Sequence, residues 1–130
     1  MSYGTSVTLA LPFDQVVPAV RASLADQGFG VLTEIDVQAT MKAKLGEDLP
    51  PYLILGACNP PLAHEALQAD PSVGLLLPCN VVVRETGDGT VVEAIDPRMM
   101  VSVSDSPALR PVADEAASRL RTALDTLPAS

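Results

Sequence analysis

The sequence predicts an α+β fold, in which a single-copy, curved and mostly antiparallel sheet of about five strands carries two long helices on one face and two short inserted helices. Two apolar stripes at helical spacing, one near each end of the chain, need a common surface that buries them. Apolar runs of strand length fill the middle of the chain and are separated by proline and glycine. The segment Thr86-Gly87-Asp88-Gly89 is a strong signal for a tight hairpin turn, so we expect neighbouring strands to run antiparallel.

A change of periodicity near Pro12 predicts a strand followed by a helix. Before this proline, apolar residues alternate with small or polar ones, as in a half-buried strand: Val7, Leu9 and Leu11. After it, apolar residues recur at helical spacing: Val16, Val17, Val20 and Leu24. Gly28 stands where a left-handed residue commonly ends a helix, so we expect the first long helix from Asp14 to Gln27.

The next segment predicts a strand from Gly30 to Ile35 and then a short helix. Asp36 is a favoured N-cap for this helix, and Gly46 is a favoured residue at its C-terminal end. An extended strand is the alternative, because apolar and charged residues also alternate between Met41 and Leu45.

A strand, a short helix and a longer strand are expected around the two cysteines. Tyr52 to Cys58 is an apolar run of strand length. Asn59-Pro60 favours a helix start, as N-cap and first helical residue, and Asp70-Pro71 should end that helix. Val73 to Glu85 then predicts a long strand that is bent or bulged at Pro78, because proline removes a ladder hydrogen bond.

The hairpin returns through a strand from Thr90 to Ile95, and the clearest helix of the chain follows. Ser106-Pro107 again supplies a cap and a first-turn proline. The helix that follows has a continuous apolar stripe: Leu109, Val112, Ala113, Ala116, Leu120, Ala123, Leu124 and Leu127. We expect this helix from Pro107 to Thr126, on the same sheet face as the first long helix.

Length and composition predict one domain over residues 1–130 and restrict its partners. Hydrophobic residues make up 48% and charged residues 18%, but no run reaches the roughly 20 apolar residues that a membrane span needs. The N-terminus lacks the basic and apolar parts of a secretory signal, so we expect a cytoplasmic protein. The net charge of −8 argues against binding nucleic acid. An apolar chain with an open sheet edge favours a homodimer.

The two cysteines are the main candidates for a functional site. Cys58 and Cys79 each precede an asparagine, Asn59 and Asn80, in an apolar stretch interrupted by proline. We expect the two thiols to lie close together, on neighbouring strands or beside a bulge. A helix that starts just after Cys58 would favour the thiolate there, which suits a metal or a redox partner. Buried packing is the alternative, because free cysteine is often buried.

The sole histidine, His64, completes the candidate set as a base or as a metal ligand with Cys58 and Cys79. Its alternative is a surface position on the short helix. Met99 and Met100 are candidate thioether ligands, with core filling as the alternative. The spacing of these residues matches no Cys-x-x-Cys or Cys/His zinc motif, so the identity of a cofactor stays open.

These residues predict a non-catalytic module that binds a small ligand, a metal or a redox cofactor around Cys58 and Cys79, with Asn59, Asn80 and His64 beside them. One alternative is a thiol enzyme with a cysteine nucleophile supported by His64. Another is a purely structural interaction domain in which both thiols are buried. The sequence contains no phosphate-binding glycine loop, nucleophile elbow or zinc-protease motif, so it leaves open whether the protein is an enzyme.

Several long motifs resemble the domain-of-unknown-function family 302. They are Asp36 to Gly46, Tyr52 to Pro60, His64 to Leu67, Gly74 to Val83 and Ala94 to Pro97. The resemblance covers nearly the whole chain. It implies a small prokaryotic α+β domain with a curved antiparallel sheet of the TATA-binding-protein-like type, often seen as a dimer, and it implies no particular activity.

Overall fold

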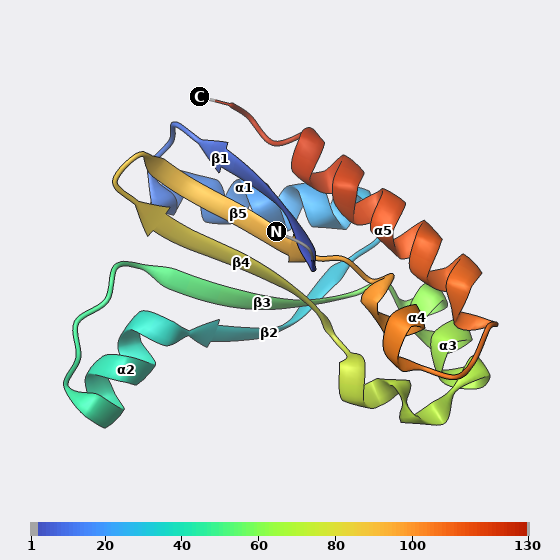
Figure 1. Ribbon diagram of the computed structural model, residues 1–130. Helices are drawn as coiled ribbons and strands as arrows, with labels where there is room; N and C mark the ends of the chain where they lie inside the picture. The colour runs from blue at the N-terminus through green and yellow to red at the C-terminus, as the bar shows by residue number, and fades with distance from the viewer. Residues whose placement is uncertain (1–2, 130) are drawn as a thin grey trace.

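The computed structural model describes residues 3–129, in which five strands form one open sheet (Figure 1). The strands lie side by side in the order β1 (Gly4–Leu9), β5 (Gly89–Ile95), β4 (Cys79–Thr86), β3 (Tyr52–Cys58) and β2 (Gly30–Asp36). Every neighbouring pair is antiparallel. The strands β1 and β2 are therefore the edges, and β3 and β4, which carry the cysteines, are interior.

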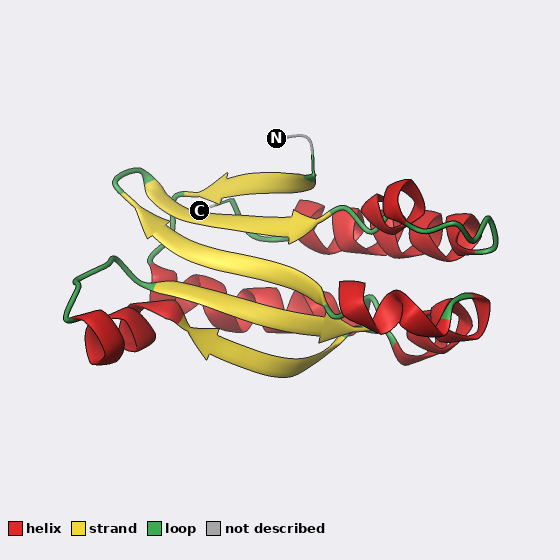
Figure 2. Cartoon of the chain, turned by 60° about the horizontal axis from the view of Figure 1, so that its bottom comes forward, coloured by secondary structure: helices red, strands yellow, loops and turns green. Residues whose placement is uncertain are grey.

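Helices cover one face of this sheet and extend past both of its ends. Of the two long helices, α1 (Phe13–Asp26) lies behind the sheet in Figure 2, whereas much of α5 (Leu109–Asp125) is seen beyond the end of the sheet. Helix α2 (Val37–Leu45) projects at one end, and three short elements gather at the other: α3 (Pro60–Ala69), the 3-10 helix η1 (Pro71–Leu76) and α4 (Met99–Val103). Within residues 3–129, every helix is too short or too polar to cross a membrane.

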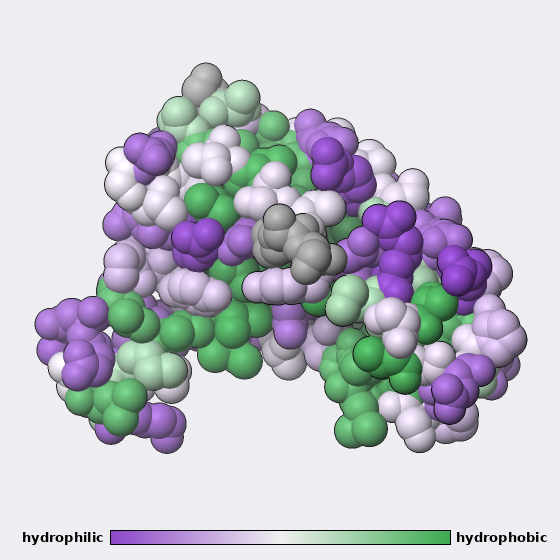
Figure 3. Space-filling view, in the orientation of Figure 1, coloured by the Kyte–Doolittle hydropathy of each residue, from purple (hydrophilic) through white to green (hydrophobic). Residues whose placement is uncertain are grey.

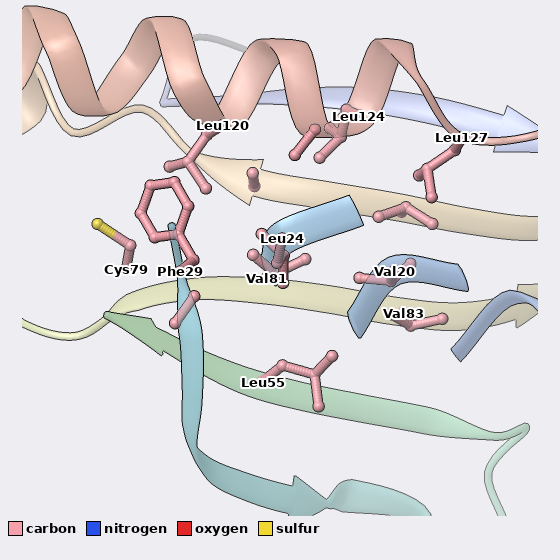
Figure 4. Packing of buried hydrophobic residues seen from close by; sticks show 14 of the residues in the cluster. Val20, Leu24, Phe29, Leu55, Cys79, Val81, Val83, Leu120, Leu124 and Leu127 are labelled. Carbon is pink, nitrogen blue, oxygen red and sulfur yellow. The ribbon is translucent and has the colours of Figure 1, made fainter. Parts of the chain in front are cut away.

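The main core lies between the sheet and the two long helices. Successive strand residues point to opposite faces, so Val81 and Val83 of β4 are buried beneath the helices whereas Val82 is only partly buried. Val81 and Val83 belong to one cluster with Leu24 of α1 and Leu120 of α5 (Figure 4). This cluster confirms the predicted α+β fold with both long helices on one face.

A second, smaller core lies beyond the sheet, where α3, η1 and α4 pack around the first half of α5. Its buried members are Ala66, Val73, Met100, Leu109, Val112 and Ala113. The apolar stripe of α5 therefore serves both cores, the first half of the helix packing in the smaller cluster and the second half over the sheet. The gap between the two cores is where a cavity forms.

Local capping residues place both short helices where the sequence predicts them. The side chain of Asp36 accepts a hydrogen bond from the backbone nitrogen of Ala39 (2.9 Å), and Gly46 ends α2 with a φ of +68°. This confirms the helix after Asp36 over the extended alternative. Gly28, with a φ of +84°, follows α1 in the left-handed conformation expected of it.

The segment before Cys79 differs from the predicted strand from Val73 to Glu85. Residues Pro71–Leu76 form η1, and β4 begins only at Cys79. The Asp70 side chain accepts a hydrogen bond from the backbone nitrogen of Ser72 (3.1 Å). The backbone carbonyl of Asp70 accepts another from the backbone nitrogen of Val73 (2.9 Å), and the two bonds start a helical turn. The run from Gly74 to Leu77 is apolar without alternating, so its composition fits either structure. Helix α4 was not predicted at all.

Candidate functional site

An apolar cavity of about 320 Å³ lies between the two cores, at the ends of β3 and β4 nearest to α3. Helices α3 and α5 form the opposite wall. The larger apolar side chains around it include Phe29, Leu32, Leu62, Leu67, Leu77, Met100 and Val112, and both cysteines also line it. A cavity of about 150 Å³ already holds benzene in a protein core, so this one has room for a small organic molecule.

The chain turns sharply at Asn59, and this turn separates α3 from the sheet. The Asn59 side-chain oxygen accepts a hydrogen bond from the backbone nitrogen of Leu62 (3.4 Å), and its nitrogen donates one to the carbonyl of Gln27 (3.3 Å). Asn59 is thus the N-cap predicted from the sequence, and it also ties α3 to the end of α1. Its polar atoms are engaged in the fold and point to a positioning role beside the cavity.

Small side chains on the facing walls leave the space unfilled. Four of the lining residues are alanines: Ala57 of β3, Ala63 and Ala66 of α3, and Ala116 of α5. Gly56 precedes Ala57 and faces the opposite side of the sheet. A Cβ at this position would run into the side chains of Thr33 and Pro78, so only glycine fits there. The cavity is therefore a product of where small residues meet, on elements distant in sequence.

The structure brings Cys58 and Cys79 to neighbouring strand ends but does not pair them. Cys79 lies opposite Ala57 in the sheet, so the two cysteines are one position out of register. Adjacent positions along a strand point to opposite faces, which directs the two side chains apart. Both are free cysteines; Cys79 is buried and Cys58 is partly exposed. The thiol pair predicted from the sequence is not supported.

Burial controls the chemistry of Cys79. Its side chain is 9% exposed, at the end of the main core, and its sulfur points away from Val81 and Val83 (Figure 4). Burial, with a smaller contribution from the neighbouring Cys58, raises the pKa of Cys79 from 9.0 to about 11. The thiol therefore stays protonated at neutral pH, whereas nucleophiles and metal ligands are thiolates.

Of the remaining candidate residues, His64, Asn80 and Met99 lie outside this cavity, whereas Met100 lines it. His64 is exposed on α3 and is not among the residues that line the cavity, so the structure does not bring it to the thiols. Asn80 is likewise exposed, and Met99 is more exposed than Met100, which lines the cavity. Within residues 3–129, no three or more histidine, cysteine or acidic side chains are grouped to hold a metal ion.

Sequence reasoning missed most of the apolar wall. The lining side chains of Phe29, Leu62, Leu77 and Val112 have neither a reactive nor a polar group, so no chemical motif marks them in the sequence. Each of them also fits the apolar pattern of its own helix, strand or loop. The signal available in the sequence was the repeated use of alanine on the inward face of α3 and α5, at Ala63, Ala66 and Ala116.

Stability should fall as the pH rises from 9 to 11, because the folded state keeps the Cys79 proton after the unfolded chain has lost it. This stabilisation is fully present below pH 9 and is lost as the pH approaches 11. The loss amounts to roughly 2 kcal/mol, at about 1.4 kcal/mol per pH unit with allowance for partial solvation. Urea unfolding of the wild type and Cys79→Ala from pH 7 to 11 measures it. If the free energy of unfolding fell equally with pH in the two proteins, this role for Cys79 would be ruled out.

Comparison with known proteins places the chain in a family without a known activity. The family described as "Domain of unknown function DUF302" matches residues 5–127. A crystal structure of an uncharacterized conserved DUF302 protein from Bacillus stearothermophilus superposes with a TM-score of 0.90 at 30% sequence identity, and the match covers 98% of this chain and 100% of that one. No curated protein matches the sequence. The match over nearly the whole length confirms the resemblance seen in the sequence motifs, and the chain belongs to the DUF302 family.

Proposed function

We propose that this domain binds a small, uncharged and apolar ligand in the cavity between β3, β4, α3 and α5. The observation that carries this proposal is the lining itself: a half-open cavity of about 320 Å³ whose walls are mostly aliphatic, aromatic and thiol or thioether side chains. Ligand sites in proteins typically measure roughly 300–1,000 Å³ and are mostly apolar, with a few polar groups that set orientation. The polar atoms of Asn59 are already bonded to the backbone of Gln27 and Leu62, so the partly exposed thiol of Cys58 is the candidate for that task.

Electrostatics favour an uncharged ligand over a metal or an anionic cofactor. Among the residues that line the cavity, the only ionisable side chains are the two thiols, and Cys79 stays protonated at neutral pH. A charged group buried there would lose its hydration without gaining a partner. The net charge of −8 adds a long-range penalty for anions. Of the ligand classes that the sequence left open, a neutral small molecule fits best.

Binding is favoured over thiol catalysis for the same reason. A cysteine nucleophile needs a base or a neighbouring cation that generates the thiolate. The lining residues described above include no histidine, carboxylate or lysine, and His64 faces solvent. Cys58 is better placed as a weak polar contact for the ligand than as a nucleophile.

Titration with two six-carbon probes tests this proposal. We expect 1-hexanol to bind at pH 7 at least about tenfold more tightly than hexanoate, because hexanoate must bury an unpaired carboxylate. Ala63→Phe, which puts a ring into the cavity wall, should abolish binding of 1-hexanol. Gln68→Phe places the same ring on an exposed position of α3 outside the lining and is the matched control.

Isothermal titration calorimetry gives the affinities, and circular dichroism melting curves verify that both variants fold. Equal binding of hexanol and hexanoate would contradict the proposal. So would a Gln68→Phe variant that weakens hexanol binding as much as Ala63→Phe does.

A cytoplasmic location stays a prediction. Self-association also stays a prediction, and we propose that the homodimer interface is formed by strand β2 and helix α2. None of the residues of α2 is buried, and Leu32, Ile35 and Leu45 expose large apolar side chains on these two elements. Figure 3 shows hydrophobic surface along the lower side of the sheet, between α2 and the end that carries η1. Such an edge is a template for pairing with a second chain. A second copy there would lie beside the cavity, because Leu32 and Thr33 of β2 line it.

A further inference from the structure

A second apolar cavity adjoins the first and shares part of its wall. It measures about 180 Å³ and lies between the start of β4, the end of β5 and helix α4. Cys79 and Met100 line both cavities, so their two sulfur-bearing side chains stand between the two spaces. The other side chains of the second cavity include Leu76, Ile95, Met99 and Val103.

The shared wall contains one long and flexible side chain, Met100, which is 6% exposed and belongs to the smaller core. Methionine is unbranched, has three rotatable side-chain bonds and adapts to the shape of its neighbours. The side chain of Met100 makes no hydrogen bond that a rotamer change would break, and Cys79 is small and protonated at neutral pH. A rotamer change of Met100 would therefore join the two cavities without leaving a buried polar group unpaired.

We infer that the ligand is an elongated, neutral aliphatic molecule, an alkyl or acyl chain with an uncharged head group, that displaces Met100 and occupies both cavities. This inference rests on the proposed function and specifies the shape of the ligand. A compact ring system fills only the first space, whereas a flexible chain follows both. The second cavity reaches the surface at Val103 and Leu76, which are 63% and 43% exposed, so the chain has an exit at that end.

A negative group also lines the second cavity and restricts the head group. Asp96 lines this cavity, and its carboxylate accepts hydrogen bonds from the Arg98 guanidinium at 2.7 and 2.9 Å. The side chain of Arg98 lowers the pKa of Asp96, so the carboxylate is ionised at neutral pH. With Arg98 already paired to Asp96, the second cavity offers no unpaired cation to an anionic head group among the lining residues described. A fatty-acid carboxylate is therefore disfavoured against the matching alcohol.

Chain-length dependence of alkanol binding tests this inference. Each buried methylene adds about 0.8 kcal/mol, or roughly a fourfold gain in affinity. We expect 1-dodecanol to bind more than about a hundredfold more tightly than 1-hexanol. Val103→Phe narrows the second cavity from its exposed end. It should weaken the binding of 1-dodecanol by at least about tenfold and the binding of 1-hexanol by less than about twofold. Leu76→Phe is a second variant at the same end.

The control is Leu75→Phe, which adds the same ring beside Leu76 at a position that is 89% exposed and outside both linings. If 1-dodecanol binds no more tightly than 1-hexanol, or if Val103→Phe and Leu76→Phe match Leu75→Phe, the elongated ligand is excluded while the first cavity stands. If 1-hexanol itself fails to bind the wild type, the proposed function fails instead. The two failures are therefore distinguishable.

Discussion

Replacing Leu55 with alanine should lower the free energy of unfolding by about 2–5 kcal/mol. Leu55 lies in the middle of β3, is 0% exposed and packs in the main core beneath the long helices (Figure 4). Alanine removes both the transfer free energy of the lost methyl groups and the contacts of the atoms around the new void. Domains of this size are stable by only about 5–15 kcal/mol, so the loss is a large fraction of the total.

Leu75→Ala is the control for this experiment, because it makes the same chemical change at a side chain that is 89% exposed. It should change the stability by less than about 0.5 kcal/mol. Urea denaturation followed by circular dichroism gives both values. Similar losses for the two variants would show that β3 does not lie in the core as described.

Gly89→Ala should destabilise the protein by about 3 kcal/mol, because this glycine has two reasons to lack a side chain. Its φ of +136° is rarely adopted by residues with a Cβ, and an added Cβ would run into the backbone carbonyl of Leu9 in β1. Backbone strain alone costs about 1–3 kcal/mol, and relief of the clash requires β1 to shift away from β5.

The neighbouring Gly87→Ala is the matched control within the same turn. A Cβ at Gly87 meets no atom within 4 Å, and its φ is not in the positive range. We expect a change of less than about 1 kcal/mol for this variant. Thermal unfolding of both variants decides the matter; a Gly87→Ala variant as unstable as Gly89→Ala would show that the turn differs from the one described.

The elements that could be predicted are those fixed by residues close together in the sequence. Asp36 and Asn59 cap the helices that follow them, and Thr86 to Gly89 forms the turn that joins β4 and β5. The apolar stripe of α5 identifies the helix in the sequence, although packing against the two cores is what stabilises it. In each case the identifying pattern lies within one continuous segment, so the sequence contains it.

The elements that could not be predicted depend on contacts between distant residues. Whether Gly74 to Leu77 extends as a strand depends on how it packs beside α3 and on the turn at Asp70. The cavity depends on small side chains that meet from β3, α3 and α5, and the alanines of one segment do not show which other segment they will face. The thiols attracted attention in the sequence because sulfur is reactive, but burial at Cys79 suppresses that reactivity.

Nuclear Overhauser effects from bound 1-hexanol to protein methyl groups test the central claim, a ligand site between the two cores, most directly. We predict contacts from the alkyl protons to the methyl groups of Leu62, Leu77 and Val112, which line the cavity from different elements. The methyl groups of Val83 and Leu9 lie in the main core away from the cavity lining and should show none. Contacts restricted to exposed residues such as Leu45 and Leu75, with none to the three cavity residues, would contradict the account.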